Sequence, residues 1–323
     1  MTHSKDARPK VVIADSVAPD QDVERRILEP LAEVVVVPFG DADALHAELR
    51  DADAVLGCYT KFTDDMVRSM TKCRIMARSG IGVDTIPMQI ATEKGIIVTN
   101  VPDYCIDEVA DHAMALMLSL VRRIDGLAQS VRAGTWDYRT VGKVRRLAGL
   151  RLGLVGFGNI AQAVARRAQA FKLDLLVHDP YVDRKTLDDW GAQGCELDTL
   201  LSQADIVSLH VPLNQKTQHL IADRTLGLMK PDAFLVNTSR GGLVDFAAVR
   251  KALEQGRLAG AALDVLEQEP PADVKKAAAV PNLLLTPHAA FNSEEATLEL
   301  REKSATEIAR VLRGEKPRYQ VNR

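Results

Sequence analysis

A glycine-rich turn between a strand and a helix constrains the fold more than any other feature of the sequence. Residues 152–155 (LGLV) have the character of a buried strand and run directly into residues 156–161 (GFGNIA), which follow the pattern G-x-G-x-x-A. In a dinucleotide-binding fold, the first glycine (Gly156) makes the tight turn and the second (Gly158) lets the backbone approach a pyrophosphate. The third position needs a small residue, here Ala161, for close packing of the helix. The helix start then offers free N–H groups and a partial positive charge to phosphates.

The surroundings of this turn favour a nucleotide site over an ordinary turn. The glycine pattern alone is a weak signal, but a strand precedes it, a helix follows it, and a second strand, Leu175–His178, comes next. Asp179 ends that strand about 20 residues on, where an acidic side chain accepts the ribose hydroxyls of NAD and repels the extra phosphate of NADP. The sequence therefore predicts NAD as the cofactor. Arg184 leaves NADP open, and the alternative is a plain turn with Asp179 as a solvated acid.

Short runs of Val, Ile and Leu alternate with helical stretches along most of the chain, which predicts an α/β fold with parallel sheets and helices on both faces. After a first series of strands, Asn100-Val101-Pro102 interrupts the pattern, and one long amphipathic helix is expected from Ile106 to about Arg132. A second series then begins near Leu150, and Ser293–Arg313 is expected to be helical. The predicted strands are Lys10–Ala14, Glu33–Pro38, Ala54–Gly57, Arg74–Ala77, Ile96–Thr99, Arg151–Val155, Asp174–His178, Asp205–Leu209, Ala233–Asn237, Ala261–Val265 and Leu283–Thr286. Two doubly wound domains follow from this pattern.

Length and composition agree with a two-domain globular protein. The chain has 323 residues, and a domain typically takes about 100–200. Its formal net charge is −3, from 41 basic and 44 acidic residues, which argues against a nucleic-acid partner. No apolar run reaches the ~20 residues of a membrane span, and the polar start MTHSKDARPK lacks the apolar stretch of a signal peptide. The 4 cysteines form no C-x-x-C pair, so no metal site is predicted, and the expected location is cytoplasmic.

Three strand ends carry candidate catalytic side chains. An enzyme that moves a hydride must also move a proton, and histidine is the usual carrier near neutral pH. His288 follows the run Leu283–Thr286, and the carboxyl ends of strands form the ligand crevice in such sheets. Arg240 follows another strand and can clamp a carboxylate with two parallel hydrogen bonds. A third strand is followed by three acids, one of which is expected to orient the histidine: Asp264, Glu267 and Glu269. The sequence pattern does not select among them, and the alternative is a capping histidine and a surface arginine.

Together these motifs resemble the D-isomer-specific 2-hydroxyacid dehydrogenases over nearly the whole chain. The resemblance rests on residues 78–84 (RSGIGVD), the Gly156 turn, residues 237–242 (NTSRGG), residues 263–265 (LDV) with Glu269-Pro270, and residues 286–290 (TPHAA). It implies that the catalytic residues are Arg240, Glu269 and His288, which selects Glu269 among the three acids. It implies that the substrate carboxylate binds to Arg240 and to the backbone of Gly80, Ile81 and Gly82. The cofactor contacts that it implies, besides Gly156 and Gly158, are Asn159, Ile160, Asp179, Val211, Pro212, Thr217, Thr238, Ser239 and Asp264.

The resemblance also implies a domain arrangement and an activity. A dinucleotide-binding (Rossmann) domain, residues 103–292, is expected to be inserted into a flavodoxin-like substrate domain made of residues 1–102 and 293–323. The expected reaction is the NAD(H)-dependent interconversion of a small D-2-hydroxy acid and its 2-oxo acid, with histidine as the general acid and base. The expected assembly is a homodimer.

Within the family, residues 286–313 and 241–245 look most similar to the C-terminal binding protein branch. Two positions depart from it, because Phe291 stands in place of a tryptophan of the substrate pocket and Asn292 in place of a tyrosine. Two alternatives accompany the dehydrogenase prediction: an NAD(H)-sensing scaffold that binds proteins, as the corepressors of this branch do, and a phosphoglycerate dehydrogenase. Phosphoglycerate dehydrogenases resemble this chain around Thr60-Lys61, but they carry an arginine for the substrate phosphate where this chain has residues 57–59 (GCY).

Overall fold

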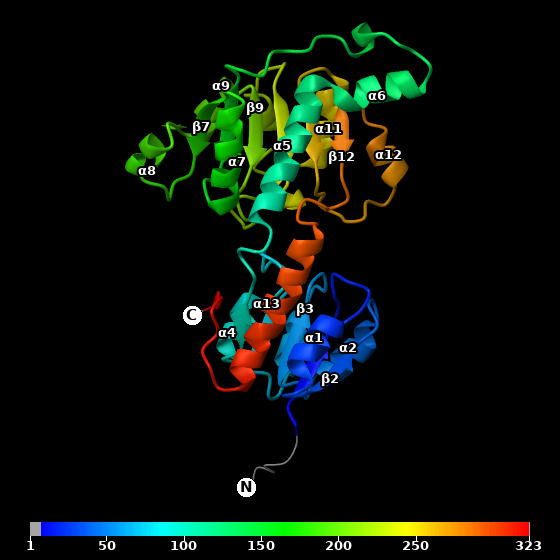
Figure 1. Ribbon diagram of the computed structural model, residues 1–323, viewed down its shortest axis with the longest axis vertical. Helices are drawn as coiled ribbons and strands as arrows, with labels where there is room; N and C mark the ends of the chain where they lie inside the picture. The colour runs from blue at the N-terminus through cyan, green and yellow to red at the C-terminus, as the bar shows by residue number, and fades with distance from the viewer. Residues whose placement is uncertain (1–7, 323) are drawn as a thin grey trace. The chain divides into compact units, whose positions relative to one another are not determined.

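The computed structural model describes residues 8–322, which form two compact units (Figure 1). The first unit ends at Tyr104 and resumes at Asn292, and the second is Cys105–Phe291, so the second is inserted into the first along the chain. The functional labels that the sequence analysis attached to the two parts stay predictions at this point. Residues 1–7 of the polar start, on which the expected lack of a signal peptide rests, lie outside the described residues.

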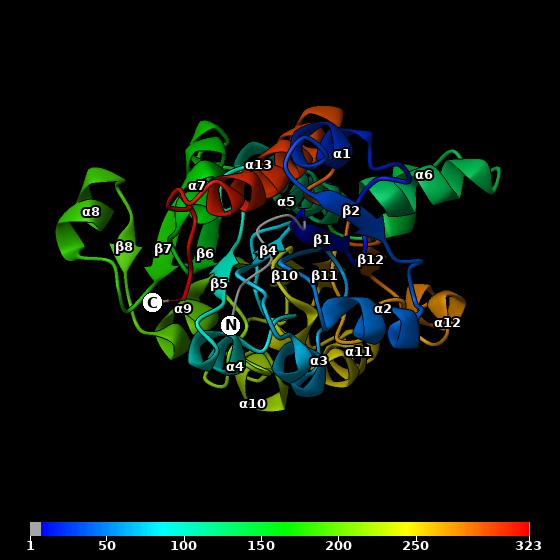
Figure 2. The ribbon, with the colours of Figure 1, turned by 90° about the horizontal axis from the view of Figure 1, so that it is seen from below.

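The first unit is a five-stranded parallel sheet with helices on both faces (Figure 2). The strand order is β2-β1-β3-β4-β5, which is the order of flavodoxin-like sheets. Its strands are β1 (Lys10–Ile13), β2 (Glu33–Val36), β3 (Ala54–Gly57), β4 (Ile75–Arg78) and β5 (Ile97–Thr99). One face packs against α1 (Asp22–Leu28) and α13 (Glu294–Leu312). The other packs against α2 (Ala42–Leu49), α3 (Asp64–Ser69) and α4 (Met88–Glu93).

The second unit is a seven-stranded parallel sheet of order β12-β11-β10-β9-β6-β7-β8. In chain order within the unit this is the Rossmann arrangement extended by one strand. Its strands are β6 (Arg151–Val155), β7 (Asp174–His178), β8 (Gln193–Gly194), β9 (Ile206–Leu209), β10 (Phe234–Asn237), β11 (Gly260–Leu263) and β12 (Leu283–Leu285). Its helices are α5 (Ile106–Arg122), α6 (Ile124–Arg132), α7 (Asn159–Ala170), α8 (Arg184–Asp189), α9 (Leu197–Gln203), α10 (Asp223–Leu226), α11 (Phe246–Glu254) and α12 (Val274–Ala278), with the 3-10 turns η1 (Tyr138–Val141) and η2 (Gly241–Leu243).

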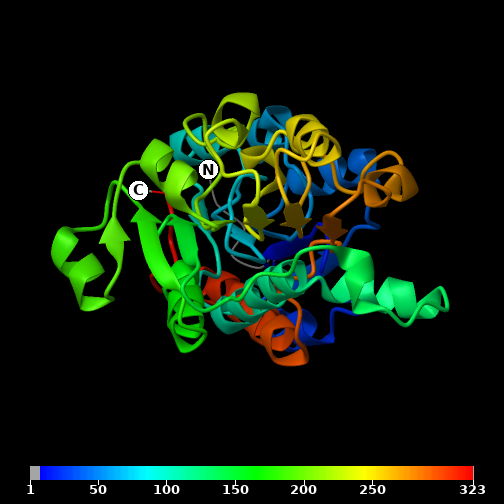
Figure 3. The same ribbon diagram turned by 90° about the horizontal axis from the view of Figure 1, so that it is seen from above.

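Helices on both faces bury this sheet, as Figure 3 shows with α5 and α7 (turquoise and green) on one side and α11 (yellow) on the other. Side chains alternate along each strand, so Leu152 and Leu154 of β6 join the core under α5 and α7, whereas Val155 joins the core under α9 and α11. Strands buried on both faces read as near-continuous apolar runs, which is why the sequence signal was strong. The two parallel sheets confirm the predicted fold class.

The prediction of one continuous helix from Ile106 to about Arg132 was wrong. It divides into α5 and α6 at Arg123, whose φ of 56° is left-handed. The Arg123 guanidinium donates to the carbonyl of Ala259 and to Oδ1 of Asn282, and it lies over the ring of Phe234. These contacts hold Arg123 out of the helical path, and α6 has no buried residue that would keep it in line with α5.

Strand β8 was missed because both of its residues are exposed and it is only 2 residues long. In the part of the chain that the structure describes, no helix combines the length and the apolar character that a membrane crossing requires.

Candidate active site

The predicted site residues of the second unit gather at one edge of its sheet. Parallel strands end at the same edge, and the loops that follow them form a ligand crevice. In chain order these loops carry Gly156 after β6, Asp179 after β7, Val211 and Pro212 after β9, Thr238, Ser239 and Arg240 after β10, Asp264 and Glu269 after β11, and His288 after β12. Residues remote in the sequence therefore meet because of the topology.

His288 and Glu269 form a hydrogen-bonded pair. Nδ1 of His288 lies 2.6 Å from Oε2 of Glu269, and the other carboxylate oxygen accepts from the backbone N–H of Leu266 at 2.8 Å. Because a carboxylate only accepts, the pair places a proton on Nδ1 and leaves Nε2 of His288 for other chemistry. Burial acts to raise the pKa of Glu269, but the hydrogen bond and charge of His288, the Leu266 N–H and the charge of Arg240 lower it below its ordinary value.

Arg240 lies on a loop that packs directly against the loop of Glu269. A Cβ added at Gly241 would lie 1.9 Å from the carbonyl carbon of Leu266, so only glycine allows this approach of the two backbones. The side chain of Asn237 fixes the Arg240 loop, donating from Nδ2 to the Arg240 carbonyl and accepting from the Ser239 N–H. All three predicted catalytic residues thus belong to the second unit, and Arg240 is near enough to Glu269 to influence its ionisation.

Asp264 has a structural task that the family resemblance did not imply. Its buried carboxylate accepts from the Thr286 hydroxyl at 2.5 Å and from the N–H groups of Ala289 and Ala290, both at 2.9 Å. Its carbonyl accepts from the N–H of His288 at 2.7 Å. His288 has a φ of 54°, a region that non-glycine residues rarely occupy, and these four bonds surround it. Whether Asp264 also contacts a cofactor stays a prediction.

The glycine turn has the features of a phosphate site. Gly156 has a φ of 90°, and a Cβ there would lie 2.5 Å from the carbonyl oxygen of His210, so the position requires glycine. Gly158 precedes α7 without a side-chain cap, so the first-turn N–H groups of Asn159 and Ile160 have no capping acceptor. The carboxylate of Asp179 accepts from the N–H groups of Phe157 and Tyr181 and keeps lone pairs on both oxygens.

The loops after β9 and β10 complete the nucleotide side of the edge. Oγ1 of Thr238 is buried without a hydrogen-bond partner among residues 8–322, as expected of an atom that meets a ligand. By contrast, Thr217 bonds to Pro212 and Asn214, and Ser239 donates to the Leu209 carbonyl, so these two hydroxyls already serve their own loops. These polar groups fit a dinucleotide. The free N–H groups suit its phosphates, the Asp179 carboxylate suits a ribose, and the unpaired hydroxyl of Thr238 can meet a further polar atom. The individual cofactor contacts stay predictions.

The predicted carboxylate-binding loop lies in the first unit, after β4. Within the described residues, the N–H groups of Gly80, Ile81 and Gly82 have no acceptor, although the carbonyls of Gly80 and Ile81 accept from the Val101 N–H and from the side-chain amide of Asn100. Free N–H groups in succession are suited to an anion.

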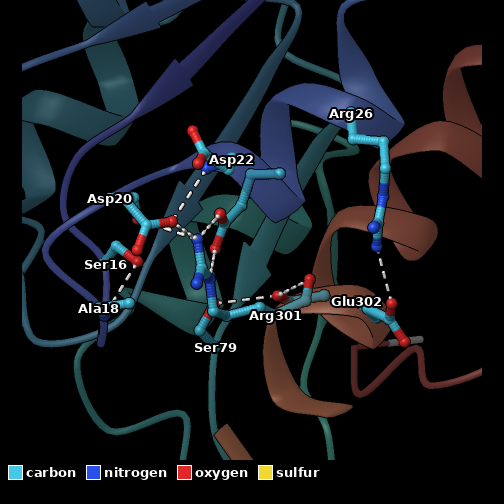
Figure 4. Close-up of polar contacts among 10 residues, drawn as sticks. Ser16, Ala18, Asp20, Asp22, Arg26, Ser79, Arg301 and Glu302 are labelled. Carbon is cyan, nitrogen blue, oxygen red and sulfur yellow. Dashed lines mark hydrogen bonds and ion pairs between the residues drawn. The ribbon is translucent and has the colours of Figure 1, made fainter. Parts of the chain in front are cut away.

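Two neighbours of this loop were not predicted. The guanidinium of Arg78 lies against Gly80, and its buried Nε has no partner among residues 8–322. The hydroxyl of Ser79 donates to that of Ser304 on α13 at 3.0 Å, close to Arg301 of the same helix (Figure 4). Arg78 could have been found from the sequence, because it begins the motif RSGIGVD (residues 78–84). The contact between Ser79 and Ser304 could not, because residues so far apart share no local pattern.

Two histidine contacts in the second unit were also missed. His219 pairs with Glu267, Nε2 to Oε1 at 2.5 Å, and His112 of α5 lies 3.0 Å from the hydroxyl of Thr286. Partners 48 and 174 positions apart leave no local sequence signal. Of the two glutamates, Glu269 contacts the side chain of His288, while Glu267 contacts another histidine; the catalytic role of Glu269 stays a prediction. Among the described residues, no group of three or more His, Cys, Asp or Glu side chains could hold a metal ion.

Comparison with known proteins places the chain in a family. The family model described as D-isomer specific 2-hydroxyacid dehydrogenase, NAD binding domain, matches residues 114–290, more than half of the chain. Glyoxylate reductase of Thermococcus litoralis is 38% identical over 283 residues, which cover 85% of each protein. The chain belongs to the D-isomer specific 2-hydroxyacid dehydrogenase family. D-3-phosphoglycerate dehydrogenase of Methanocaldococcus jannaschii is also 38% identical, over 97% of this chain, but the chain spans only 59% of that relative's length.

Solved structures agree with this assignment. D-lactate dehydrogenase from Aquifex aeolicus, complexed with NAD and lactic acid, has a TM-score of 0.87 and 28% identity, with 95% of this chain and 96% of that chain covered. An NADPH-dependent glyoxylate/hydroxypyruvate reductase from Sinorhizobium meliloti, in complex with NADP and malonate, has a TM-score of 0.87 and 28% identity, with 98% and 97% covered. The predicted family and its class, NAD(P)-dependent 2-hydroxyacid dehydrogenases, are confirmed. These relatives do not include a C-terminal binding protein, so that finer resemblance and the scaffold role gain no support.

Proposed function

We propose that this protein interconverts a small D-2-hydroxy acid and its 2-oxo acid, with NAD(H) as the cofactor. The observation that carries the proposal is the 2.6 Å contact between Nδ1 of His288 and Glu269, beside Arg240 and at the ligand edge of a Rossmann sheet, in a chain of this family. In this proposal the first unit is the substrate domain and the second binds the nucleotide. Bound NAD supplies the acceptor for the hydride that leaves the substrate carbon.

His288 moves the proton in this reaction. Glu269 holds Nδ1–H, so Nε2 is the atom that takes the hydroxyl proton in oxidation and returns it in reduction. Glu269 keeps its charge at neutral pH because its pKa lies below the ordinary value despite burial, and a fixed negative charge stabilises the imidazolium that forms. The pair therefore sets both the tautomer and the charge of the proton carrier.

The substrate carboxylate is held by positive groups and N–H donors. Arg240 offers a planar fork to a carboxylate and polarises the carbonyl oxygen as negative charge develops on it. The free N–H groups of Gly80, Ile81 and Gly82 supply the backbone donors that the family resemblance implies. The remainder of a small acid needs little further recognition, which is consistent with the small substrates named for the relatives.

We infer a preference for NAD from the neighbourhood of Asp179. A cavity of about 830 Å³ beside Asp179 is lined by two further acids, Asp188 and Glu196, and by Arg184. Arg184 is 94% exposed and already pairs with Asp188 at 3.8 Å, whereas the negative charges of Asp179, Asp188 and Glu196 would repel a 2′-phosphate in this cavity. Membership of the family does not choose between NAD and NADP, because one relative is in complex with NADP. The proposed preference for NAD therefore rests on Asp179 and the acids beside it in this chain.

The proposed activity is tested by following NADH oxidation with glyoxylate, hydroxypyruvate, pyruvate, phenylpyruvate and branched-chain 2-oxo acids. We expect turnover of at least one acid, faster with NADH than with NADPH, and a D-configured product. Substitution Asp179→Ser should narrow the gap between the two cofactors. Tight NADH binding without turnover of any acid would overturn the proposal and favour an NAD(H)-sensing scaffold.

A second candidate, a phosphoglycerate dehydrogenase, is favoured by the match to the M. jannaschii enzyme and by Arg78. The unpaired Nε of Arg78 beside Gly80 offers a second positive charge that a phosphorylated substrate could use. A phosphorylated 2-oxo acid in the same assay separates the two candidates. Turnover at least about tenfold above that of the unphosphorylated acid, lost in Arg78→Met, favours the phosphorylated substrate, because losing a charged partner of a bound anion weakens binding strongly.

We also propose that two copies form a homodimer and that the protein is cytoplasmic. The homodimer is supported by apolar side chains exposed along α6 and the following turn: Ile124, Val131, Trp136 and Tyr138. Trp136 is 90% exposed and Tyr138 80%, and they follow Ile124 and Val131 in one exposed segment, a grouping expected of a surface that a partner covers.

A further inference from the structure

A chain of three polar side chains lies behind His288 in the second unit. Nε2 of His112, on α5, is 3.0 Å from the hydroxyl of Thr286, and that hydroxyl is 2.5 Å from Oδ1 of Asp264. His112 itself is 3.5 Å from the same carboxylate oxygen. The Asp264 side chain is fully buried, and that of His112 is 25% exposed.

The directions of these hydrogen bonds follow from what each group can donate. The Asp264 carboxylate only accepts, so the single hydroxyl proton of Thr286 points at it. The Thr286 oxygen then faces His112 as an acceptor, which requires a proton on Nε2 of His112. The chain therefore runs from the His112 N–H through the Thr286 hydroxyl to Asp264, and the partly exposed histidine links the buried carboxylate to α5.

This chain ends on the group that holds the backbone of His288. Besides the Thr286 hydroxyl, Asp264 accepts from Ala289 and Ala290, which directly follow His288, and its carbonyl accepts from the His288 N–H. His288 has a left-handed φ of 54°, and such a conformation persists only where surrounding contacts over-determine it. A rotated Asp264 carboxylate would release the two N–H groups and, with them, the turn that aims the imidazole.

We propose that His112 and Thr286 are positioning residues for His288, acting through Asp264. The inference rests on the proposed function, because it assigns a consequence to the orientation of the His288 ring. Thr286 fixes the rotation of the Asp264 carboxylate, and His112 fixes the Thr286 hydroxyl. Neither residue touches Nδ1 of His288, which Glu269 occupies. An ordinary packing role for His112 would instead change stability and cofactor binding together with turnover.

The test compares substitutions that remove each hydrogen bond with substitutions that keep it. Thr286→Val removes the hydroxyl at nearly constant shape, and Thr286→Ser retains it. His112→Leu removes the N–H, and His112→Gln keeps a donor. We expect kcat with glyoxylate and NADH to fall by about 10- to 100-fold in the Val and Leu variants, since small displacements of a catalytic group have effects of this size. The Ser and Gln variants should stay within about threefold of the wild type.

Three readouts separate positioning from folding. In the Val and Leu variants, the KM for glyoxylate and the Kd for NADH should stay close to those of the wild type. Tm should fall by only a few degrees, because Asp264 keeps its two backbone N–H partners. The double variant should lose no more than the worse single variant, because both act through one chain. His46→Leu, on α2 of the first unit, is the matched histidine control and should leave kcat unchanged. Wild-type kcat in Thr286→Val and His112→Leu, or a parallel loss of kcat, NADH binding and Tm, would overturn the inference.

A measurement without turnover distinguishes this failure from failure of the proposed function. The imidazole NMR signal of His288, identified by its loss in His288→Asn, should shift or broaden in Thr286→Val and His112→Leu and keep its wild-type position in Thr286→Ser. If the wild type turns over no 2-oxo acid, the proposed function fails. The NMR signal of His288 then still shows whether His112 and Thr286 position its imidazole. An unchanged signal in both disruptive variants contradicts it.

Discussion

Two glutamates in the loop after β11 face different histidines. Glu269 contacts His288 at 2.6 Å, whereas Glu267, two residues earlier, contacts His219 at 2.5 Å. The two pairs are similar in geometry and in exposure, and their side chains are all between 35% and 42% exposed. They therefore form a matched comparison between a pair that we propose orients the proton carrier and a pair that links two loops.

Glu269→Gln should lower kcat by about 100-fold or more, because it removes the charge that orients the proton carrier and stabilises the imidazolium. Glu267→Gln should change kcat by less than about threefold, since an exposed side-chain pair of this kind contributes only about 0–1 kcal/mol and lies away from His288. Steady-state kinetics of both variants with the same 2-oxo acid make the comparison. Equal effects of the two substitutions would mean that the His288 pair has no special role.

His210, at the end of β9, makes the stability of the second unit depend on pH. Burial lowers the pKa of His210 to about 4, from an ordinary value of 6.5. Between these two pH values the unfolded chain binds a proton at residue 210 and the folded chain does not. The free energy of unfolding therefore decreases as the pH falls through this window, by up to about 3 kcal/mol from this residue.

His210→Gln should remove this contribution while keeping a polar partner for Ser208, which lies 2.9 Å from Nε2. The free energy of unfolding in urea, measured at about pH 7 and about pH 4.5, should then fall less in the variant than in the wild type. An identical decrease in both proteins would show that His210 takes up its proton in the folded state as readily as in the unfolded state, which would contradict the lowered pKa.

Single site residues could be predicted from the sequence where a local motif contains them. Gly156 and Asp179 belong to such a pattern, and the structure places them at the predicted strand ends. The choice of Glu269 over Glu267 needed the family resemblance, because two acids two residues apart have the same local signal. The contact of His112 with Thr286 was out of reach, since it depends on the packing of α5 against the sheet rather than on spacing.

At the scale of elements, a buried ion pair joins α13 to α1 (Figure 4). Nη2 of Arg301 lies 2.7 Å from Oε2 of Glu24 and also donates to Asp20, and both Arg301 and Glu24 are buried. The hydrogen bond and charge of Glu24 raise the pKa of Arg301, so the arginine keeps its charge at every accessible pH. A nearby pair of the same two helices, Arg26 with Glu302, is exposed.

Arg301→Ala should destabilise the first unit by about 3–5 kcal/mol, because it leaves the Glu24 carboxylate buried without a partner. Arg26→Ala, the exposed control on the same helix interface, should change stability by less than about 1 kcal/mol. Denaturant unfolding of both variants gives the two values. A loss of similar size in both would contradict the distinction between the buried and the exposed pair.

Strands were more predictable than helix ends. Every apolar run that the sequence analysis named as a strand overlaps one, because burial on both faces demands apolar residues throughout. The break at Arg123 was not visible, since the apolar spacing continues on both sides and the cause is a tertiary contact with Asn282 and Ala259. The exposed strand β8 has no apolar signal at all.

At the scale of the whole molecule, the exposed aromatic residues after α6 predict the assembly. The wild type should sediment with twice the 35.3 kDa mass of one chain, since burying Trp136 and its neighbours between two copies removes a large apolar surface from water. Trp136→Glu should favour the monomer. Phe39→Glu, at an aromatic residue of the first unit that is 73% exposed, is the control and should leave the mass unchanged. A monomeric wild type contradicts the homodimer.

The alternation of strands and helices was enough to predict two doubly wound sheets, because few other architectures bury so many short apolar runs. The identity of the substrate was beyond the sequence, since it depends on side chains that line a pocket rather than on a motif.

NADH oxidation and NADH binding by the wild type and by His288→Asn test the central claim most directly. The wild type should oxidise NADH in the presence of a small 2-oxo acid, and His288→Asn should bind NADH with an unchanged Kd while its kcat falls by about 100-fold or more. A variant that retains turnover, or one that loses turnover and NADH affinity to the same extent, would contradict the assignment of His288 as the proton carrier.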